Sequence, residues 1–214
     1  MVAVVLGSAE KGCLEETLML ENAFQSLRGH LIIAMPSLED ENFQRTVVLL
    51  AEHTPEGAFG VIVNRPLHLK LKDLFQNQHQ GFAITDVVWF GGPVEPQRGL
   101  FLHNIPLVPM RNPITLENDL YICGNLDSVE YIANLRGKGL DQDQHFRFFL
   151  GYSGWAPGQL EHELRQSSWL HCKATRSLIL ETTPEDLWET AIRSLGVAPE
   201  SLVDDQGSGG RVLH

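Results

Sequence analysis

Two arginines flank a pair of strand-like segments and could together bind an anion. Arg45 precedes a run rich in β-branched residues, Thr46 to His53, and Arg65 follows a second run, Ala58 to Asn64. If the runs pair as an antiparallel hairpin, both guanidinium groups lie at its open end, where they could bind an anion. They could equally pair with one of three acidic residues nearby. These are Glu39, Asp40 and Glu41. Asn64 is expected to hydrogen-bond the local backbone.

A second group of candidate side chains follows an aromatic segment near residue 150. The sequence GYSGW over 151–155 has the first glycine and the serine of a nucleophile elbow. It has Trp155 where the elbow requires a second glycine, so a hydrolase is not predicted. A glycine-permitted turn leading into a helix is the preferred interpretation. The binding candidates in this part of the chain are Tyr152, Trp155, Gln159 and Glu161.

Patterns for metal, phosphate and acid–base chemistry are weak. Glu161, His162 and Glu163 are consecutive, and neighbouring residues on a helix point in different directions, so they cannot converge on one ion. The sequence GGP over 91–93 lacks the spacing of a phosphate-binding loop and predicts a tight turn between strands. We therefore predict no metal or cofactor and assign no catalytic residue. In an enzyme, His53 or Glu161 would be the acid or base.

Short apolar runs separated by turn residues predict the elements that position these side chains. Strands are expected over 31–35, 46–53, 58–64, 87–90, 99–103, 119–123, 145–150, 169–173 and 177–181. Helices are expected over 14–27, 69–75, 128–136 and 158–165, and from Pro184 onward. For the 128–136 helix Asp127 is the expected cap, and for the last helix Thr183.

The order of these elements indicates the fold class. Strands dominate the middle of the chain and helices occur singly between groups of strands, so we predict an α+β fold with a mixed, largely antiparallel sheet. We expect residues 1–28 to be an N-terminal extension with one amphipathic helix, 29–203 to be the domain, and 204–214 to be a mobile tail.

Composition and charge exclude several classes of protein. The chain has 214 residues, of which 43% are hydrophobic, enough to bury a core and to exclude disorder throughout. Its formal net charge of −11 disfavours direct binding to DNA or to an anionic membrane. Three widely separated cysteines and the lack of a signal peptide predict a cytoplasmic protein.

An ordered set of motifs resembles the YqgE/AlgH family of bacterial proteins. The set comprises GHLIIAMPSLED over 29–40, NF at 42–43, RTVV over 45–48, EH at 52–53, GAFG over 57–60, NRP over 64–66, GGPV over 91–94 and GYSGWAPGQLEHE over 151–163. The resemblance covers about residues 29–196 and implies a bent or barrel-like sheet flanked by helices. Members are often described as regulators of transcription, and the resemblance implies no known reaction or catalytic residue.

These observations leave three hypotheses for function. The first is a non-catalytic binding or regulatory protein that acts through a protein partner or a small anionic ligand, with transcription as one process that it could affect. The second is an enzyme with a cleft near the 45–65 hairpin and the 151–163 segment. The third, direct DNA binding, is disfavoured because no helix-turn-helix with a basic second helix can be recognised in the sequence.

Overall fold

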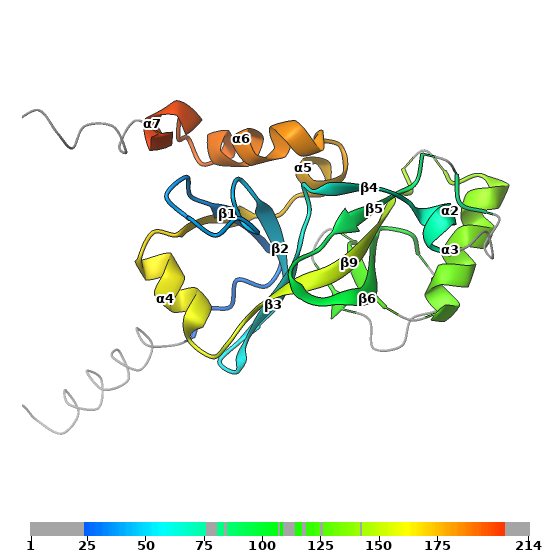
Figure 1. The fold of residues 1–214 in the computed structure, drawn as a ribbon, viewed down its shortest axis with the longest axis horizontal. Coiled ribbons are helices and arrows are strands. Elements are labelled where there is room, and N and C mark those ends of the chain that lie inside the picture. The colour runs from blue at the N-terminus through cyan, green and yellow to red at the C-terminus, as the bar shows by residue number, and fades with distance from the viewer. Residues whose placement is uncertain are drawn as a thin grey trace, which may run out of the picture.

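Ten strands and six helices make up the described part of the chain in its computed structural model (Figure 1). The structure describes residues 24–75, 81–83, 85–106, 108, 114–116, 119–124, 126–141 and 143–203. The strands are β1 (His30–Ala34), β2 (Val47–Thr54), β3 (Gly57–Ile62), β4 (Pro66–Lys70), β5 (Val87–Phe90), β6 (Val94–His103), β7 (Ile114–Thr115), β8 (Tyr121–Cys123), β9 (Phe146–Trp155) and β10 (Trp169–Lys173). The helices are α2 (Leu71–Leu74), α3 (Leu126–Lys138), α4 (Gln159–Arg165), α5 (Arg176–Leu180), α6 (Pro184–Ser194) and α7 (Pro199–Val203).

All ten strands belong to one sheet that does not close into a barrel. The strand order is β10-β1-β2-β3-β9-β6-β8-β7, with β5 paired to β9 and β4 paired to β5. Every pairing is antiparallel except that of β5 with β9, which is parallel. The predicted α+β class with a largely antiparallel sheet is therefore confirmed.

Helices cover the sheet on both faces. Figure 1 shows α5, α6 and α7 along one side, α4 on the opposite side, and α2 with α3 at the far end. In β1, Leu31 and Ile33 pack in the core shared with α6, whereas Ile32 and Ala34 pack in the core shared with α4. Because both faces of β1 are buried, its sequence is continuously apolar instead of alternating.

Most local predictions are confirmed, and the exceptions have physical reasons. The hairpin of β2 and β3 is present, and Thr183 caps α6 by accepting from the backbone N–H of Asp186. The strand predicted over 177–181 is wrong, because Thr175 caps a short helix, α5, there. A short apolar run alone does not distinguish a strand from a buried helical turn. The predicted cap Asp127 lies inside α3, which begins one residue earlier.

Other predicted elements differ in their limits or lie beyond the described residues. The 145–150 strand continues as β9 to Trp155, so the turn expected over 151–155 is wrong. The 69–75 helix is shorter, because β4 occupies the chain up to Lys70. The extension helix falls largely outside the described residues, as does the tail over 204–214.

A close backbone contact joins β9 to the segment before β6. The N–H of Gly91 donates to the carbonyl of Leu150 at 2.9 Å, and the carbonyl of Gly91 accepts from Ile62 at 2.9 Å. A Cβ atom on Gly92 would lie 2.3 Å from the carbonyl oxygen of Tyr152, and one on Gly151 would lie 2.3 Å from that of Gly92. Side chains are therefore excluded at both glycines.

Two buried side chains in the second half of the sheet, His103 and Cys123, form a neutral pair. The Nδ1 atom of His103 accepts from the backbone N–H of Ile105, and its Nε2 atom lies 3.6 Å from Cys123 Sγ. Burial lowers the pKa of His103 to about 4 and raises the pKa of the Cys123 thiol. The pair is therefore not a thiolate–imidazolium couple at neutral pH.

The Gly151→Ala substitution is expected to destabilise the protein by about 2 kcal/mol or more, because Gly151 has φ +73° and has no room for a Cβ atom. Gly154→Ala in the same strand is the matched control. A Cβ atom there comes no closer than 3.4 Å to its nearest neighbour, a Tyr152 ring carbon, so stability should change by less than about 0.5 kcal/mol or rise. Urea unfolding of both variants tests this, and equal losses would contradict it.

His103 is expected to make stability depend on pH between 6.5 and 4. Its pKa is about 4 in the folded protein and 6.5 ordinarily, so the unfolded chain is protonated first as the pH falls. Its contribution is complete above pH 6.5 and decreases by about 3 kcal/mol by pH 4. Urea unfolding across this range should show a shallower dependence for His103→Gln than for the unmodified protein. Parallel curves would show that another group is responsible.

Candidate functional site

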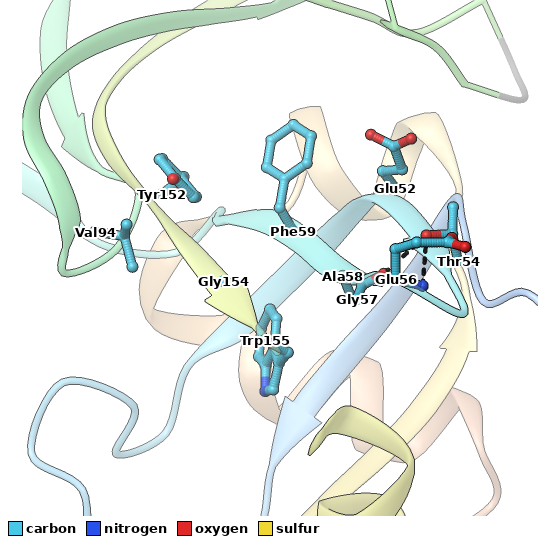
Figure 2. Close-up of a pocket in the computed structure, with 10 residues that line it drawn as sticks. All are labelled: Glu52, Thr54, Glu56, Gly57, Ala58, Phe59, Val94, Tyr152, Gly154 and Trp155. Carbon is cyan, nitrogen blue, oxygen red and sulfur yellow. Dashed lines mark hydrogen bonds between the residues drawn. The ribbon is translucent and has the colours of Figure 1, made fainter. Parts of the chain in front are cut away.

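A groove of about 510 Å³ lies on β2, β3 and β9 beside the start of β6 (Figure 2). It contains two of the side chains selected from the sequence, Tyr152 and Trp155. The complete lining is Glu52, Thr54, Glu56, Gly57, Ala58, Phe59, Val94, Tyr152, Gly154 and Trp155. It is the candidate functional site, because parts of the 45–65 hairpin and of the 151–163 segment, near which the sequence predicted a cleft, meet there.

The strand register places the groove side chains in two rows. Glu52 on β2 is opposite Phe59 on β3, which is opposite Gly154 on β9. In the next row Tyr152 on β9 is opposite Val94 on β6. Residues directly opposite each other in antiparallel strands share a face. The register between β2 and β3 shifts between Leu50 and Glu52, and bulges of this kind re-aim side chains next to functional sites.

Gly154 leaves the floor of the groove without a side chain. It is exposed, and a Cβ atom there would meet nothing closer than ordinary van der Waals contact. Glycine within a strand is unfavourable by roughly 0.5–1 kcal/mol relative to alanine. Packing therefore does not explain this glycine, in contrast to Gly151 three residues earlier.

One rim of the groove carries a guanidinium held between a carboxylate and an aromatic ring. Arg98 Nη1 donates to Glu95 Oε2 at 3.2 Å, and its Cζ atom lies 5.6 Å from the centre of the Tyr152 ring. The Tyr152 hydroxyl donates to Glu95 at 3.2 Å. Partial burial, followed by this hydrogen bond and the charge of Glu95, raises the pKa of Tyr152 against a lowering effect of Arg98. The hydroxyl therefore remains protonated at neutral pH.

His53, the candidate base, is buried on the other face of β2 with both ring nitrogens engaged. Its Nδ1 atom accepts from the backbone N–H of Leu27 at 2.8 Å, so its proton is on Nε2. Nε2 donates to Glu161 Oε1 at 3.0 Å. His53 and Glu161 therefore form a structural contact between β2, α4 and the chain before β1.

Glu163 holds two tryptophans behind the groove. Its Oε2 atom accepts from the indole N–H of Trp155 at 2.9 Å and of Trp169 at 2.8 Å. Its Oε1 atom accepts from the side-chain amide of Gln159 at 2.9 Å. The position of the Trp155 indole, on the sheet face that α4 covers, therefore depends on this carboxylate.

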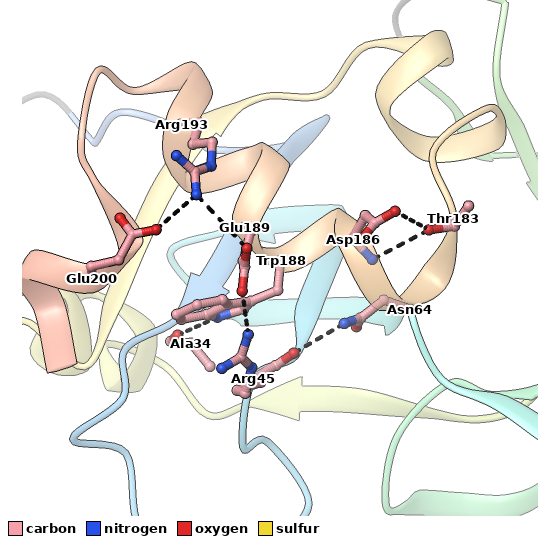
Figure 3. A network of polar contacts seen from close by, with 9 residues as sticks. All are labelled: Ala34, Arg45, Asn64, Thr183, Asp186, Trp188, Glu189, Arg193 and Glu200. Atoms are coloured by element: carbon pink, nitrogen blue, oxygen red, sulfur yellow. Dashed lines mark hydrogen bonds and ion pairs between the residues drawn. The ribbon is translucent and has the colours of Figure 1, made fainter.

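The remaining candidates, Arg45, Asn64 and Arg65, lie at the opposite end of the hairpin, and Figure 3 shows the first two. Arg45 donates to Glu189 on α6 at 2.9 Å and lies 4.4 Å from the centre of the Trp188 ring. Asn64 accepts from the backbone N–H of Val47 and donates to the Arg45 carbonyl. The expected local hydrogen bonds of Asn64 are thus present.

Arg65 donates to backbone carbonyls. Pairing with an acidic side chain nearby was the alternative to anion binding that the sequence allowed. It donates to the carbonyls of Asn42 at 2.7 Å, Gln44 at 2.9 Å and Glu41 at 3.2 Å. Burial lowers the pKa of its guanidinium, against a raising effect of Asp40.

The seven candidates thus divide into separate places. Tyr152 and Trp155 line the groove, and Gln159 and Glu161 lie behind it on α4. The other three are near the open end of the hairpin. The sequence patterns did not group Glu52, Phe59 and Gly154 into one site. Strand alternation could have placed Glu52 and Phe59 on sheet faces, but only the register brings them together.

The described residues offer no group of three or more histidine, cysteine, aspartate or glutamate side chains that could hold a metal ion. Within that same part of the chain, none of the helices is long and apolar enough to cross a membrane. A further cavity of about 310 Å³ has a mainly apolar lining that includes Phe75, Phe101 and Phe148. Another, of about 530 Å³, lies between β10 and the helices α5 and α6.

The fold and the groove define a class of protein: an α+β domain whose open sheet carries a groove on one face. The family model described as DUF179, AlgH-like, matches residues 31–200. The chain belongs to this family, which confirms the resemblance identified in the sequence.

Individual relatives agree with this assignment. A UPF0301 protein from Magnetococcus marinus is 40% identical over 188 residues, which cover 85% of this chain and 95% of that protein. The solution structure of the AlgH protein from Pseudomonas aeruginosa matches with a TM-score of 0.66 at 33% identity, covering 88% of this chain and all of that one. A crystal structure from Corynebacterium diphtheriae, at 24% identity and a TM-score of 0.64, covers 80% of this chain and 88% of that one, and it shares the fold.

Glu163→Ala is expected to destabilise the protein by about 2–4 kcal/mol, because it leaves two indole N–H groups without their acceptor. Glu163→Gln retains one carbonyl oxygen as an acceptor and should lose about half as much. Urea unfolding followed by tryptophan fluorescence measures both. Equal stability of Glu163→Ala and the unmodified protein would show that water replaces the carboxylate.

Proposed function

We propose that the chain is a non-catalytic binding protein that holds a segment of a partner protein in the groove on β2, β3 and β9. Gly154 is the observation that carries this proposal. The fold has room for a side chain at this exposed strand position, yet the sequence leaves the groove floor bare. A bare floor lets the main chain of a partner approach the sheet closely.

The groove lining gives less support to the enzyme hypothesis. The hydroxyl of Tyr152 has a raised pKa, and the candidate base His53 is buried with both nitrogens hydrogen-bonded. The hydroxyl nearest Glu52 and Glu56 in the lining is that of Thr54, which donates to the Gly57 carbonyl and accepts from the Glu56 N–H. A binding role requires none of these groups to react.

Direct DNA binding is also disfavoured, although the fold contains a suitable pair of helices. Only residues 181–183 separate α5 from α6, a spacing similar to that of a helix-turn-helix. However, α6 exposes Glu185 and Asp186, which would repel phosphates. An influence on transcription would therefore run through the partner protein.

Two further features support a cytoplasmic location and the choice of a protein, not a small anionic ligand, as the partner. Cys123 and Cys172 are free thiols, which is consistent with a reducing, cytoplasmic compartment. The alternative partner, a small anionic ligand at Arg45 and Arg65, would compete with contacts already made, because Arg45 pairs with Glu189 and Arg65 binds three carbonyls.

Photo-crosslinking in the cells that make the protein tests the proposal. With p-benzoylphenylalanine replacing Phe59 in the groove, we expect a discrete adduct with one protein. The same group at Leu195, an exposed residue at the end of α6, should not form this adduct.

The Gly154→Val substitution, combined with the crosslinker at position 59, should abolish the adduct while leaving the unfolding temperature within a few degrees. It fills the floor of the groove in a strand where valine is favourable. An adduct that survives Gly154→Val, or that forms equally from position 195, would overturn the proposal.

A further inference from the structure

The groove combines carboxylates and aromatic rings with no cation in its lining. Glu52 and Glu56 are exposed at one end, and Phe59 and Tyr152 are half-buried beside them. Figure 2 shows Phe59 between Tyr152 on one side and Glu52 on the other. Resting on the function proposed above, we infer that the partner segment presents an arginine side chain, which lies on the Phe59 ring and pairs with Glu52 and Glu56.

The two carboxylates are available for such a pairing. Neither Glu52 nor Glu56 makes an ion pair with any residue that the structure describes. Glu52 lies directly across from Phe59, so a guanidinium on the ring is within reach of its carboxylate. Glu56 belongs to the turn between β2 and β3 and faces the same groove.

The next row of the groove already contains the interaction that we propose. There the guanidinium of Arg98 lies 5.6 Å from the centre of the Tyr152 ring and donates to the carboxylate of Glu95 at 3.2 Å. The Phe59 and Tyr152 rings are neighbours, with centroids 5.7 Å apart and planes at 82°. Phe59 with Glu52 therefore repeats the ring and the carboxylate of that row but lacks its guanidinium.

The charge of the whole chain favours a cationic partner. The formal net charge is −11, and a potential of that sign attracts a basic segment and raises its association rate at low salt. An arginine suits the site better than a lysine, because its planar guanidinium stacks on a ring while donating to two carboxylates. An anionic ligand would be repelled from this groove.

A peptide titration of the full chain tests the inference. The probe is acetyl-Gly-Arg-Leu-Gly-amide, and its control carries citrulline, a neutral residue of nearly the same shape, in place of arginine. We expect the arginine peptide to shift the amide resonances of Phe59, Tyr152 and Gly154. The citrulline peptide should bind about tenfold more weakly. Equal binding, or no binding of the arginine peptide at about 10 mM, would overturn the inference.

Charge-removing variants locate the effect. Glu52→Gln with Glu56→Gln should weaken the arginine peptide about tenfold and leave the citrulline peptide unchanged. Glu181→Gln with Glu185→Gln removes two exposed carboxylates elsewhere and should have no effect beyond a small change in salt dependence. If both double variants weaken binding of the arginine peptide equally, the effect depends only on the net charge of the chain, which would contradict the inference.

Crosslinking from position 59 separates this inference from the function on which it rests. Loss of the adduct in both Gly154→Val and the Glu52→Gln, Glu56→Gln variant supports both. If the adduct is lost only in Gly154→Val, the binding groove is supported and the inference of an arginine in the partner is overturned. An adduct that is insensitive to either change overturns both.

Discussion

The fold depends on one close contact between backbones, where Gly91 and Gly92 meet Gly151 and Tyr152. Strand β9 pairs with β5 and β6 before this point and with β3 after it, so it links the two parts of the sheet. The contact has no room for a Cβ atom, and Gly151 also needs a positive φ angle. Two motifs some sixty residues apart in the sequence, GGPV and GYSGW, are therefore explained by a single packing constraint. Its consequence is that the second half of β9 lies against β3 instead of turning away as a loop.

The candidate groove follows from that geometry. Once β9 lies beside β3, Gly154 falls opposite Phe59, and the bulge in β2 brings Glu52 into the same row. The two glycines of the GYSGW motif then have different reasons to be glycine. Gly151 is required by its backbone conformation and its neighbours, whereas a Cβ atom on Gly154 would make only ordinary van der Waals contacts. A requirement of the fold explains the first, and the proposed binding role offers a reason for the second.

Local sequence patterns were sufficient to predict local structure, but they could not predict which distant strands pair. The hairpin and the cap of α6 depend on residues close together in the sequence, so turn and capping signals were sufficient. The apolar run of α5 was ambiguous at that range. The site depends on register across three strands and on a bulge, which no local pattern specifies. Arg45 and Arg65 were the most conspicuous charges, but the structure gives them contacts within the fold.

The carboxylates of this acidic chain are of two kinds. Glu163, Glu161 and Asp86 are committed to hydrogen bonds that hold elements together, with two indoles, an imidazole and Arg136 respectively. Glu52 and Glu56 make no such bonds among the described residues. Exposed acids that only aid solubility are common, so lack of a partner is not in itself informative. What distinguishes this pair is its surroundings: a half-exposed aromatic ring and a strand floor without a side chain. A soluble surface requires neither feature, and together they suit the binding of a basic segment of another protein, as proposed above.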